Sequence, residues 1–179
     1  MPGESCDITL ILAPPWDISH PWPAPFYLAS YLRSYGYCVQ TLDYNMTLYR
    51  WGCRHGLSSL WRPEADTLWS DGSLAFLACI PDGEAIRGHI VGFSTTCSNL
   101  AFTLEMARHI RRIYPKKKII MGGHGLLMFP HNPRLVPCDL ADAICCGEGE
   151  HTLREVMDKG FENLEDVAGI FIPGENGWR

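Results

Sequence analysis

The chain has 179 residues, of which 46% are hydrophobic and 20% are charged, and its formal net charge is −5. This composition indicates one folded domain, residues 1–179, and excludes an intrinsically disordered chain. The mild acidity argues against a nucleic-acid partner, because phosphate contacts need clustered Lys and Arg. No apolar run approaches the ~20 residues of a membrane helix, and residues 1–7 lack the basic region of a signal peptide. We therefore expect a cytoplasmic protein whose eight cysteines are thiols.

Short apolar runs alternate with amphipathic segments along the chain. The pattern predicts strands at 7–12, 37–43, 90–94, 118–122, 141–146 and, less regularly, 169–172, and helices at 23–35, from about 98 to Pro115, and 150–159. In the second of these helices, the spacing predicts a buried stripe of Leu100, Leu104, Ala107, Ile110 and Ile113. Apolar strands alternating with helices indicate an α/β fold of the Rossmann-like, flavodoxin-like type, with a parallel five-stranded sheet and helices on both faces.

Residues 44–88 interrupt this alternation. They contain Trp51, Trp61 and Trp69 together with several Gly, Ser and Pro residues. We expect an irregular, partly helical insertion within the single domain.

The segments that follow the predicted strands are the places to look for a site, because open parallel sheets bind ligands outside the carboxyl ends of their strands. Three of these segments, at 94–99, 122–125 and 147–149, are small, polar or rich in glycine. Glycine lets the backbone approach a ligand closely, and hydroxyl groups add donors and acceptors without bulk. Ordinary turn chemistry explains each segment alone. Together, at one edge, they predict a slot for a large flat ligand.

The segment after the first strand argues against nucleotide binding. A dinucleotide fold would carry Gly-x-Gly-x-x-Gly there, and a phosphate loop would end in Gly-Lys-Ser/Thr. Residues 14–23 contain prolines and tryptophans instead. A flavin site would need a Ser-, Thr- or Gly-rich loop at a helix N-terminus. A flavin- or nucleotide-binding flavodoxin-like domain therefore stays the second hypothesis, and an interaction module without a cofactor is the third.

Several motifs carry a family resemblance over nearly the whole chain except 44–88. They are Pro14-Pro15 with Pro25 to Gly36 in the following helix, Val39 with Leu42-Asp43, the run VGFSTT at 91–96, IIMGGH at 119–124, and ICCGEGE at 144–150 with Thr152-Leu153. With these motifs the chain resembles the cobalamin-binding N-terminal domain of cobalamin-dependent radical SAM enzymes.

The resemblance implies how cobalamin would bind. The corrin ring would lie across the carboxyl edge of the sheet, and its nucleotide tail would run between strands and helices. Ser94, Thr95 and Thr96 would line the tail, and Gly122 and Gly123 would make room for the benzimidazole base. The full set of implied cofactor-binding residues is Pro15, Trp16, Ser94, Thr95, Thr96, Gly122, Gly123, His124, Gly147, Glu148 and Gly149.

The resemblance also implies a function as the cofactor module of a radical SAM methyltransferase or related enzyme, in which cobalamin delivers a methyl group or serves a radical rearrangement. The iron–sulfur cluster and S-adenosylmethionine would belong to a following barrel domain with a Cys-x-x-x-Cys-x-x-Cys triplet, which this sequence lacks. We therefore expect the chain to be non-catalytic alone, and to be either a fragment without that barrel or a stand-alone homologue.

The expected cobalt ligation differs from that of related methyltransferase and mutase domains, which carry Asp-x-His-x-x-Gly with a ligating His. Here Asp17 and His20 are one residue too far apart, and Pro23 replaces the glycine. We expect no protein ligand to the metal, with ligation by His20 as the alternative to a surface or loop-packing role. For His124, a hydrogen bond to the cofactor and a water-facing turn both stay open. Glu148 is expected to cap the helix beside it.

Overall fold

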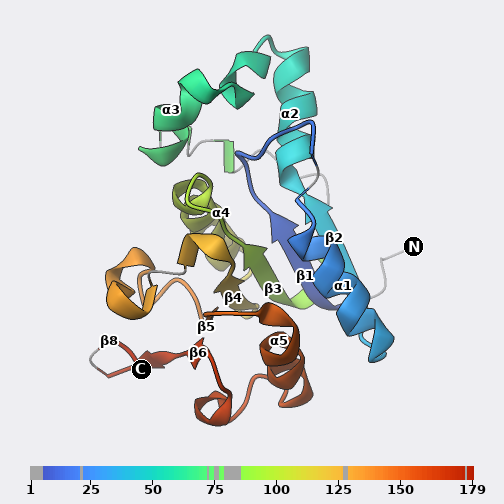
Figure 1. Ribbon diagram of the computed structural model, residues 1–179, viewed down its shortest axis with the longest axis vertical. Coiled ribbons are helices and arrows are strands. Elements are labelled where there is room, and N and C mark those ends of the chain that lie inside the picture. The colour runs from blue at the N-terminus through green and yellow to red at the C-terminus, as the bar shows by residue number, and fades with distance from the viewer. Residues whose placement is uncertain are drawn as a thin grey trace.

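The computed structural model describes residues 6–20, 22–71, 73–74, 77–78, 86–126, 129–175 and 177–179. Of the predicted insertion, positions 72, 75–76 and 79–85 lie outside the described residues. The molecule is a central sheet flanked by helices, with α2 and α3 projecting at one end (Figure 1).

A six-stranded sheet has the order β2-β1-β3-β4-β5-β6. Its strands are β1 (Cys6–Leu12), β2 (Val39–Asp43), β3 (Gly88–Ser94), β4 (Lys118–Gly122), β5 (Ala143–Cys145) and β6 (Ile170–Phe171). The first five are parallel, which confirms the α/β class and the mostly parallel sheet.

The predicted number of five strands is wrong, because β6 adds a sixth strand antiparallel to β5. Gly169, at φ 76°, turns the chain beside Cys146, whose N–H donates to the Gly169 carbonyl over 2.8 Å. Positive φ is readily adopted by glycine. The chain then runs back along β5, so the last strand has the opposite direction.

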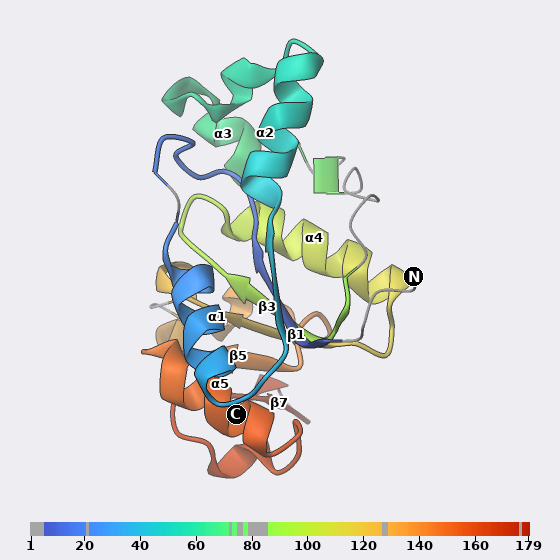
Figure 2. The same cartoon turned by 90° about the vertical axis from the view of Figure 1, so that its right-hand side faces the viewer.

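Helices cover both faces of the sheet, as Figure 2 shows. Helices α1 (Ala24–Ser34) and α5 (Gly149–Asp158) lie on one face, and α4 (Leu100–Ile113) lies on the other. Successive side chains of a strand point to opposite faces of the sheet. Ile8 and Leu10 pack with the residues of α1 and α5, whereas Ile11 packs with those of α4.

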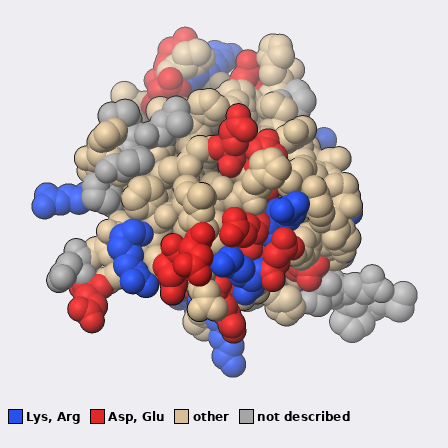
Figure 3. All heavy atoms as spheres, turned by 60° about the horizontal axis from the view of Figure 1, so that its bottom comes forward, with Lys and Arg blue, Asp and Glu red and all other residues tan. Residues whose placement is uncertain are grey.

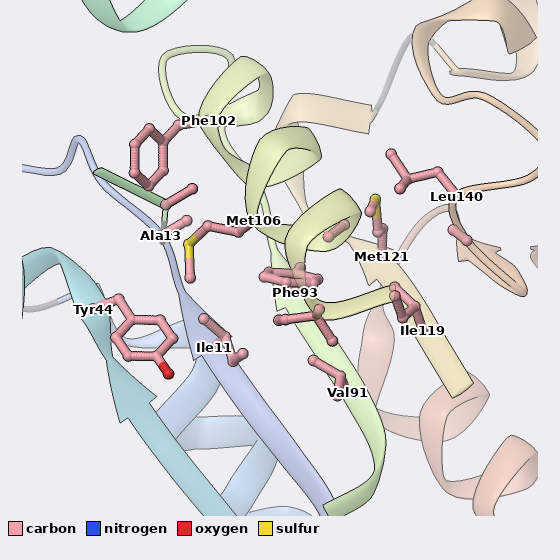
Figure 4. Packing of buried hydrophobic residues seen from close by; sticks show 14 of the residues in the cluster. Ile11, Ala13, Tyr44, Val91, Phe93, Phe102, Met106, Ile119, Met121 and Leu140 are labelled. Carbon is pink, nitrogen blue, oxygen red and sulfur yellow. The ribbon is translucent and has the colours of Figure 1, made fainter. Parts of the chain in front are cut away.

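The core on the α4 side is large and contains aromatic and sulfur-bearing side chains (Figure 4). Phe102, Thr103, Met106, Ala107 and Ile110 are the buried residues of α4. The predicted stripe is wrong at its end, because Ile113 is 45% exposed, and Leu100 and Leu104 are only partly buried. The face with Phe102 and Met106 turns toward the sheet because it buries the larger side chains against Ile11 and Phe93.

The segment after β2 packs onto this same core. It comprises α2 (Tyr44–Arg54), the 3-10 turns η1 (Ser58–Trp61) and η2 (Pro63–Ala65), and α3 (Asp66–Ser70). Trp69 of α3 is fully buried, its indole N–H donates to the Leu60 carbonyl over 2.6 Å, and its ring lies 5.2 Å from that of Phe102.

The remaining elements are short. They are the 3-10 turns η4 (His124–Leu126), η5 (Phe129–His131), η6 (Pro133–Leu135) and η7 (Leu164–Asp166), and the hairpin of β7 (Pro173–Gly174) and β8 (Gly177–Trp178). Within the described part of the chain, no helix is long and apolar enough to cross a membrane.

Charges of both signs gather at the end of the molecule that carries α5 and the segment after it (Figure 3). Two ion pairs belong to this region, Arg154 with Asp158 at 3.6 Å and Lys159 with Asp166 at 3.9 Å. Because acidic and basic groups are mixed, this face does not form the basic patch that nucleic acid requires.

Candidate functional site

A cavity of about 460 Å³ opens at the carboxyl edge of the sheet, between β1, β3, β4 and β5 on one side and α1 and α5 on the other. This is the edge at which open α/β sheets bind their ligands. Its lining residues are Leu10, Ala24, Pro25, Tyr27, Leu28, Gly92, Phe93, Ser94, Ile120, Met121, Gly122, Gly123, His124, Cys145, Gly147, Glu148, Gly149, Glu150 and Leu153.

The floor of the cavity is built from small residues that the strand register brings side by side. One row across three neighbouring strands is Ser94, Gly122 and Cys145. In the row below it, Gly92 of β3 stands next to Leu10 of β1. Larger side chains in these rows would fill the space between the sheet and the two helices. The cavity therefore exists because the strand ends carry little side-chain volume.

Helices α1 and α5 form the opposite wall, with Leu28 and Leu153 among the residues that line it. At Gly149, the first residue of α5, an added Cβ would lie 3.4 Å from Leu28 Cδ2. That distance is an ordinary van der Waals contact, so a side chain is tolerated there. A long side chain at Gly149 would cross from α5 toward α1 and narrow the cavity.

The segments after β3 and β4 are bonded to each other through Thr95. Its backbone N–H and its hydroxyl both donate to the Gly122 carbonyl, over 2.7 and 2.8 Å, and its carbonyl accepts from the N–H of Gly125 over 3.1 Å. A Cβ at Gly123 would lie 2.5 Å from the Thr95 carbonyl oxygen. The contact between the two loops therefore requires glycine at 123.

Thr96 begins the turn into α4. Its N–H donates to Asn99 Oδ1 over 2.7 Å, and its hydroxyl lies 3.0 Å from the Ser98 hydroxyl. Asn99 also donates to the Ala13 carbonyl over 3.1 Å, which ties this turn to the end of β1. Thr95 and Thr96 are buried and do not line the cavity, whereas Ser94 does.

The loop after β1 folds over this edge and brings Trp22 to the site. The Trp22 indole N–H donates to the Ser94 hydroxyl over 3.0 Å, and its ring lies 4.4 Å from Trp16 and 6.3 Å from His124. Pro15 is buried and follows a cis bond from Pro14. The sequence predictions included Pro15 and Trp16 but missed Trp22. Trp22 could have been found from the sequence, because it lies in the same loop as Trp16.

The charges around the cavity are acidic. Glu148 and Glu150 line it, and no lining residue among those described is Lys or Arg. Glu148 occupies the N-cap position of α5, as predicted, but its side chain makes no capping hydrogen bond. Burial raises the pKa of Cys145 to about 11, which keeps this floor residue a neutral thiol. A ligand with several phosphate charges would be repelled here.

His20 lies in the loop after β1 and outside the cavity lining. Its side chain is 79% exposed, and its Nδ1 lies 3.2 Å from Asp17 Oδ2 and 2.8 Å from the Ser19 hydroxyl. His124 is exposed at the cavity mouth. Within the described ranges, no three His, Cys, Asp or Glu side chains are grouped so that they could hold a metal ion.

The structure thus brings most of the predicted residues to one place. Ser94, Gly122, Gly123, His124, Gly147, Glu148 and Gly149 line one cavity. Sequence reasoning missed the contribution of α1 through Pro25, Tyr27 and Leu28, and that of Cys145. A helix following the first strand predicts the presence of such residues near this edge, but not which of its faces points inward.

Comparisons with known proteins give structural neighbours only. No protein-family model matches the chain, and no curated protein matches it. The radical S-adenosylmethionine methyltransferase TsrM from Kitasatospora setae, with cobalamin and a [4Fe-4S] cluster bound, is similar with a TM-score of 0.65 and 16% identity, over 97% of this chain and 28% of that chain. The structure of TsrM with tryptophan substrate and the SAM analog aza-SAM bound is similar with a TM-score of 0.62 and 18% identity. This match covers 96% of this chain and 29% of that chain.

A second enzyme has the same kind of similarity. The cobalamin-dependent S-adenosylmethionine radical enzyme OxsB, in its apo form, has a TM-score of 0.52 and 19% identity, over 98% of this chain and 22% of that chain. The chain therefore spans less than a third of the length of these neighbours. At these identities the likeness establishes a shared fold.

Proposed function

We propose that this chain is a cobalamin-binding module of a radical SAM methyltransferase or related enzyme. The observation that carries the proposal is the cavity at the carboxyl edge of the sheet, with its floor of small residues between α1 and α5. The fold similarity to TsrM, whose structure holds cobalamin, supports it. When bound, cobalamin supplies a cobalt centre that carries a methyl group or takes part in a radical rearrangement.

The residues present fit part of this cofactor. Ligand pockets for drug-sized molecules measure roughly 300–1,000 Å³, so a cavity of about 460 Å³ admits a group the size of the nucleotide tail. It is too small for the whole cobalamin, so the corrin ring belongs outside the rim. The floor at Ser94, Gly122 and Cys145 is flat enough for an aromatic base because none of the three carries a large side chain.

The lining charges favour cobalamin over the alternative ligands. A nucleotide or flavin mononucleotide brings two or more negative charges, which two glutamates without a cation would repel. Cobalamin has a single phosphodiester charge that its cobalt-corrin centre balances. The loops after β3 and β4 do close onto each other at Thr95, as an interaction module without a cofactor would require, but the cavity persists beside them.

The residues have distinct roles in this proposal. Ser94, Gly122, His124, Gly147, Glu148 and Gly149 would contact the cofactor, since they line the cavity. Thr95 and Thr96 would hold the loops in place through the hydrogen bonds that already use their side chains. Trp16 and Trp22 would border the rim. The barrel that supplies S-adenosylmethionine and the cluster would be a partner domain of the parent enzyme.

The test is retention of the cofactor by the purified chain. The protein is mixed with hydroxocobalamin, excess ligand is removed by gel filtration, and the absorption spectrum is recorded. Corrin bands in equimolar amount with the protein are expected. Flavin mononucleotide and ATP are offered in parallel samples. A colourless protein, or retention of either nucleotide in place of the corrin, would contradict the proposal.

A further inference from the structure

We propose that Cys6 and Cys38 form a reversible intrachain disulfide, and that this pair is a thiol-redox site separate from the cavity. The two Sγ atoms lie 2.9 Å apart. A disulfide bond is about 2.03–2.05 Å long, so the sulfurs need to approach by less than about 1 Å. Nothing in the proposed cobalamin function requires the pair.

The backbone holds both residues at the start of their strands. Cys6 is the first residue of β1, and Cys38 immediately precedes β2. The N–H groups of Asp7 and Ile8 both donate to the Cys38 carbonyl, over 3.0 and 3.4 Å, and the Cys38 N–H donates to Asp7 Oδ2 over 2.8 Å. These bonds fix the distance between the two cysteines, so the close approach of their sulfurs does not depend on a mobile segment.

The two thiols are suited to different steps of thiol–disulfide exchange. Cys38 is exposed, whereas Cys6 is 4% exposed. Hydrogen bonding with Cys38 is the largest cause that raises the pKa of Cys6 above its ordinary value of 9.0, and burial adds to it. Cys6 therefore keeps its proton while the accessible Cys38 reacts first, because the thiolate is the nucleophile and access limits exchange.

A small-molecule disulfide such as glutathione disulfide is the oxidant. The Cys38 thiolate attacks one of its sulfurs, which forms a mixed disulfide and releases one glutathione as thiolate. Cys6 then loses its proton and attacks the Cys38 sulfur, which releases the second glutathione. The pair loses two electrons and two protons, and one glutathione disulfide becomes two glutathione molecules.

The bond would lie at the amino edge of the sheet, opposite the cavity. The segment between the two cysteines contains the loop after β1 and the whole of α1. Cross-linking its ends restricts the unfolded chain, which stabilises the folded state. Oxidation would therefore make the element that supplies one wall of the cavity harder to unfold.

The test uses the full reduced chain in glutathione buffers of increasing oxidised fraction. Samples are quenched with acid, free thiols are alkylated in denaturant, and tryptic peptides are analysed without reduction. Cleavage after Arg33 and Arg50 places Cys6 in fragment 1–33 and Cys38 in fragment 34–50, each without another cysteine. The expected product is these two fragments joined, with two hydrogens lost.

Matched variants decide the assignment. Cys38→Ser should lose the joined fragments, whereas Cys53→Ser, at another exposed cysteine, should keep them. The melting temperature should rise on oxidation of the wild type and of Cys53→Ser, but not of Cys38→Ser. Alkylation of both cysteines at every buffer ratio, or arrest of Cys38 as a glutathione adduct while Cys6 stays a thiol, would overturn the proposal. Neither readout involves cobalamin.

Discussion

The indole N–H of Trp22 donates a hydrogen bond to the hydroxyl of Ser94, over 3.0 Å and across 72 positions of sequence. This bond fastens the loop after β1 to the end of β3 at the mouth of the cavity. Trp16 packs against the same indole, with ring centroids 4.4 Å apart. The rim of the candidate site is therefore shaped by an aromatic loop together with a strand end.

Removing the Ser94 hydroxyl should loosen this rim. We expect Ser94→Ala to lower the free energy of unfolding by about 0.5–1.5 kcal/mol, the usual net value of one hydrogen bond. Trp22→Phe keeps a ring but removes the donor, so Ser94→Ala added to that variant should cost almost nothing further. Urea denaturation of the two single variants and the double variant measures the coupling. Strictly additive losses would show that the bond contributes nothing.

Filling the gap between α5 and α1 should block the proposed cofactor. Gly149→Leu places a side chain beside Leu28 without backbone strain, because an added Cβ makes only an ordinary contact there. We expect at least a tenfold loss of hydroxocobalamin affinity with an unchanged circular dichroism spectrum. Glu155→Leu, on the same helix but outside the cavity lining, is the control and should bind like the wild type. Equal hydroxocobalamin affinity of both variants would show that the nucleotide tail does not occupy this cavity.

His20 should not ligate the metal. Its side chain points into solvent, and its Nδ1 is engaged with Asp17 and Ser19. We expect the electron paramagnetic resonance spectrum of the bound Co(II) cobalamin to lack nitrogen hyperfine splitting from a lower ligand, and His20→Ala to leave it unchanged. Splitting that disappears in His20→Ala would identify a histidine ligand and reverse this prediction.

Asp142 should make the stability of the fold depend on pH. Burial tends to raise its pKa, but hydrogen bonds from Arg111 and from the Ile119 N–H, over 2.6 and 2.9 Å, outweigh burial and hold the pKa below its ordinary value of 3.8. A carboxyl group whose pKa is lower in the folded state stabilises the fold at pH values above its unfolded-state pKa. This stabilisation is lost as the pH falls through the folded-state pKa.

We therefore expect Asp142→Asn to lower the free energy of unfolding at pH 7 by about 1.5–3 kcal/mol, the range for hydrogen bonds to charged groups. The difference from the wild type should shrink once the pH falls below about 3.8. The exposed Asp139 supplies the control, since Asp139→Asn should leave the profile unchanged. A pH-independent difference would mean that the carboxylate charge plays no part.

Trp69 should hold the segment after β2 onto the core. Its side chain is fully buried, packs on Phe102 and donates to the Leu60 carbonyl. We expect Trp69→Ala to cost about 3–5 kcal/mol, as for other buried aromatic residues. Trp51→Ala, at a partly buried tryptophan stacked on His55, should cost clearly less. Chemical denaturation ranks the two, and the reverse order would show that α3 is not part of the cooperative core.

The sequence by itself determined the alternation of strands and helices and the loops that meet at one edge. Runs such as 90–94 and 118–122 are nearly all apolar, which is typical of strands that are buried on both faces of a parallel sheet. That direction places the segments at 94–99, 122–125 and 147–149 together, because parallel strands end on the same side.

Only the tertiary structure decided how those segments are used. Thr95 and Gly123 serve the contact between two loops, Trp22 reaches Ser94, and β6 runs antiparallel. The pairing of β1 with β2 likewise brings the sulfurs of Cys6 and Cys38 together. Each of these contacts joins residues whose separation in sequence says nothing of their distance in space. That distance in space is set by strand order, strand register and side-chain direction, and no local sequence pattern encodes these.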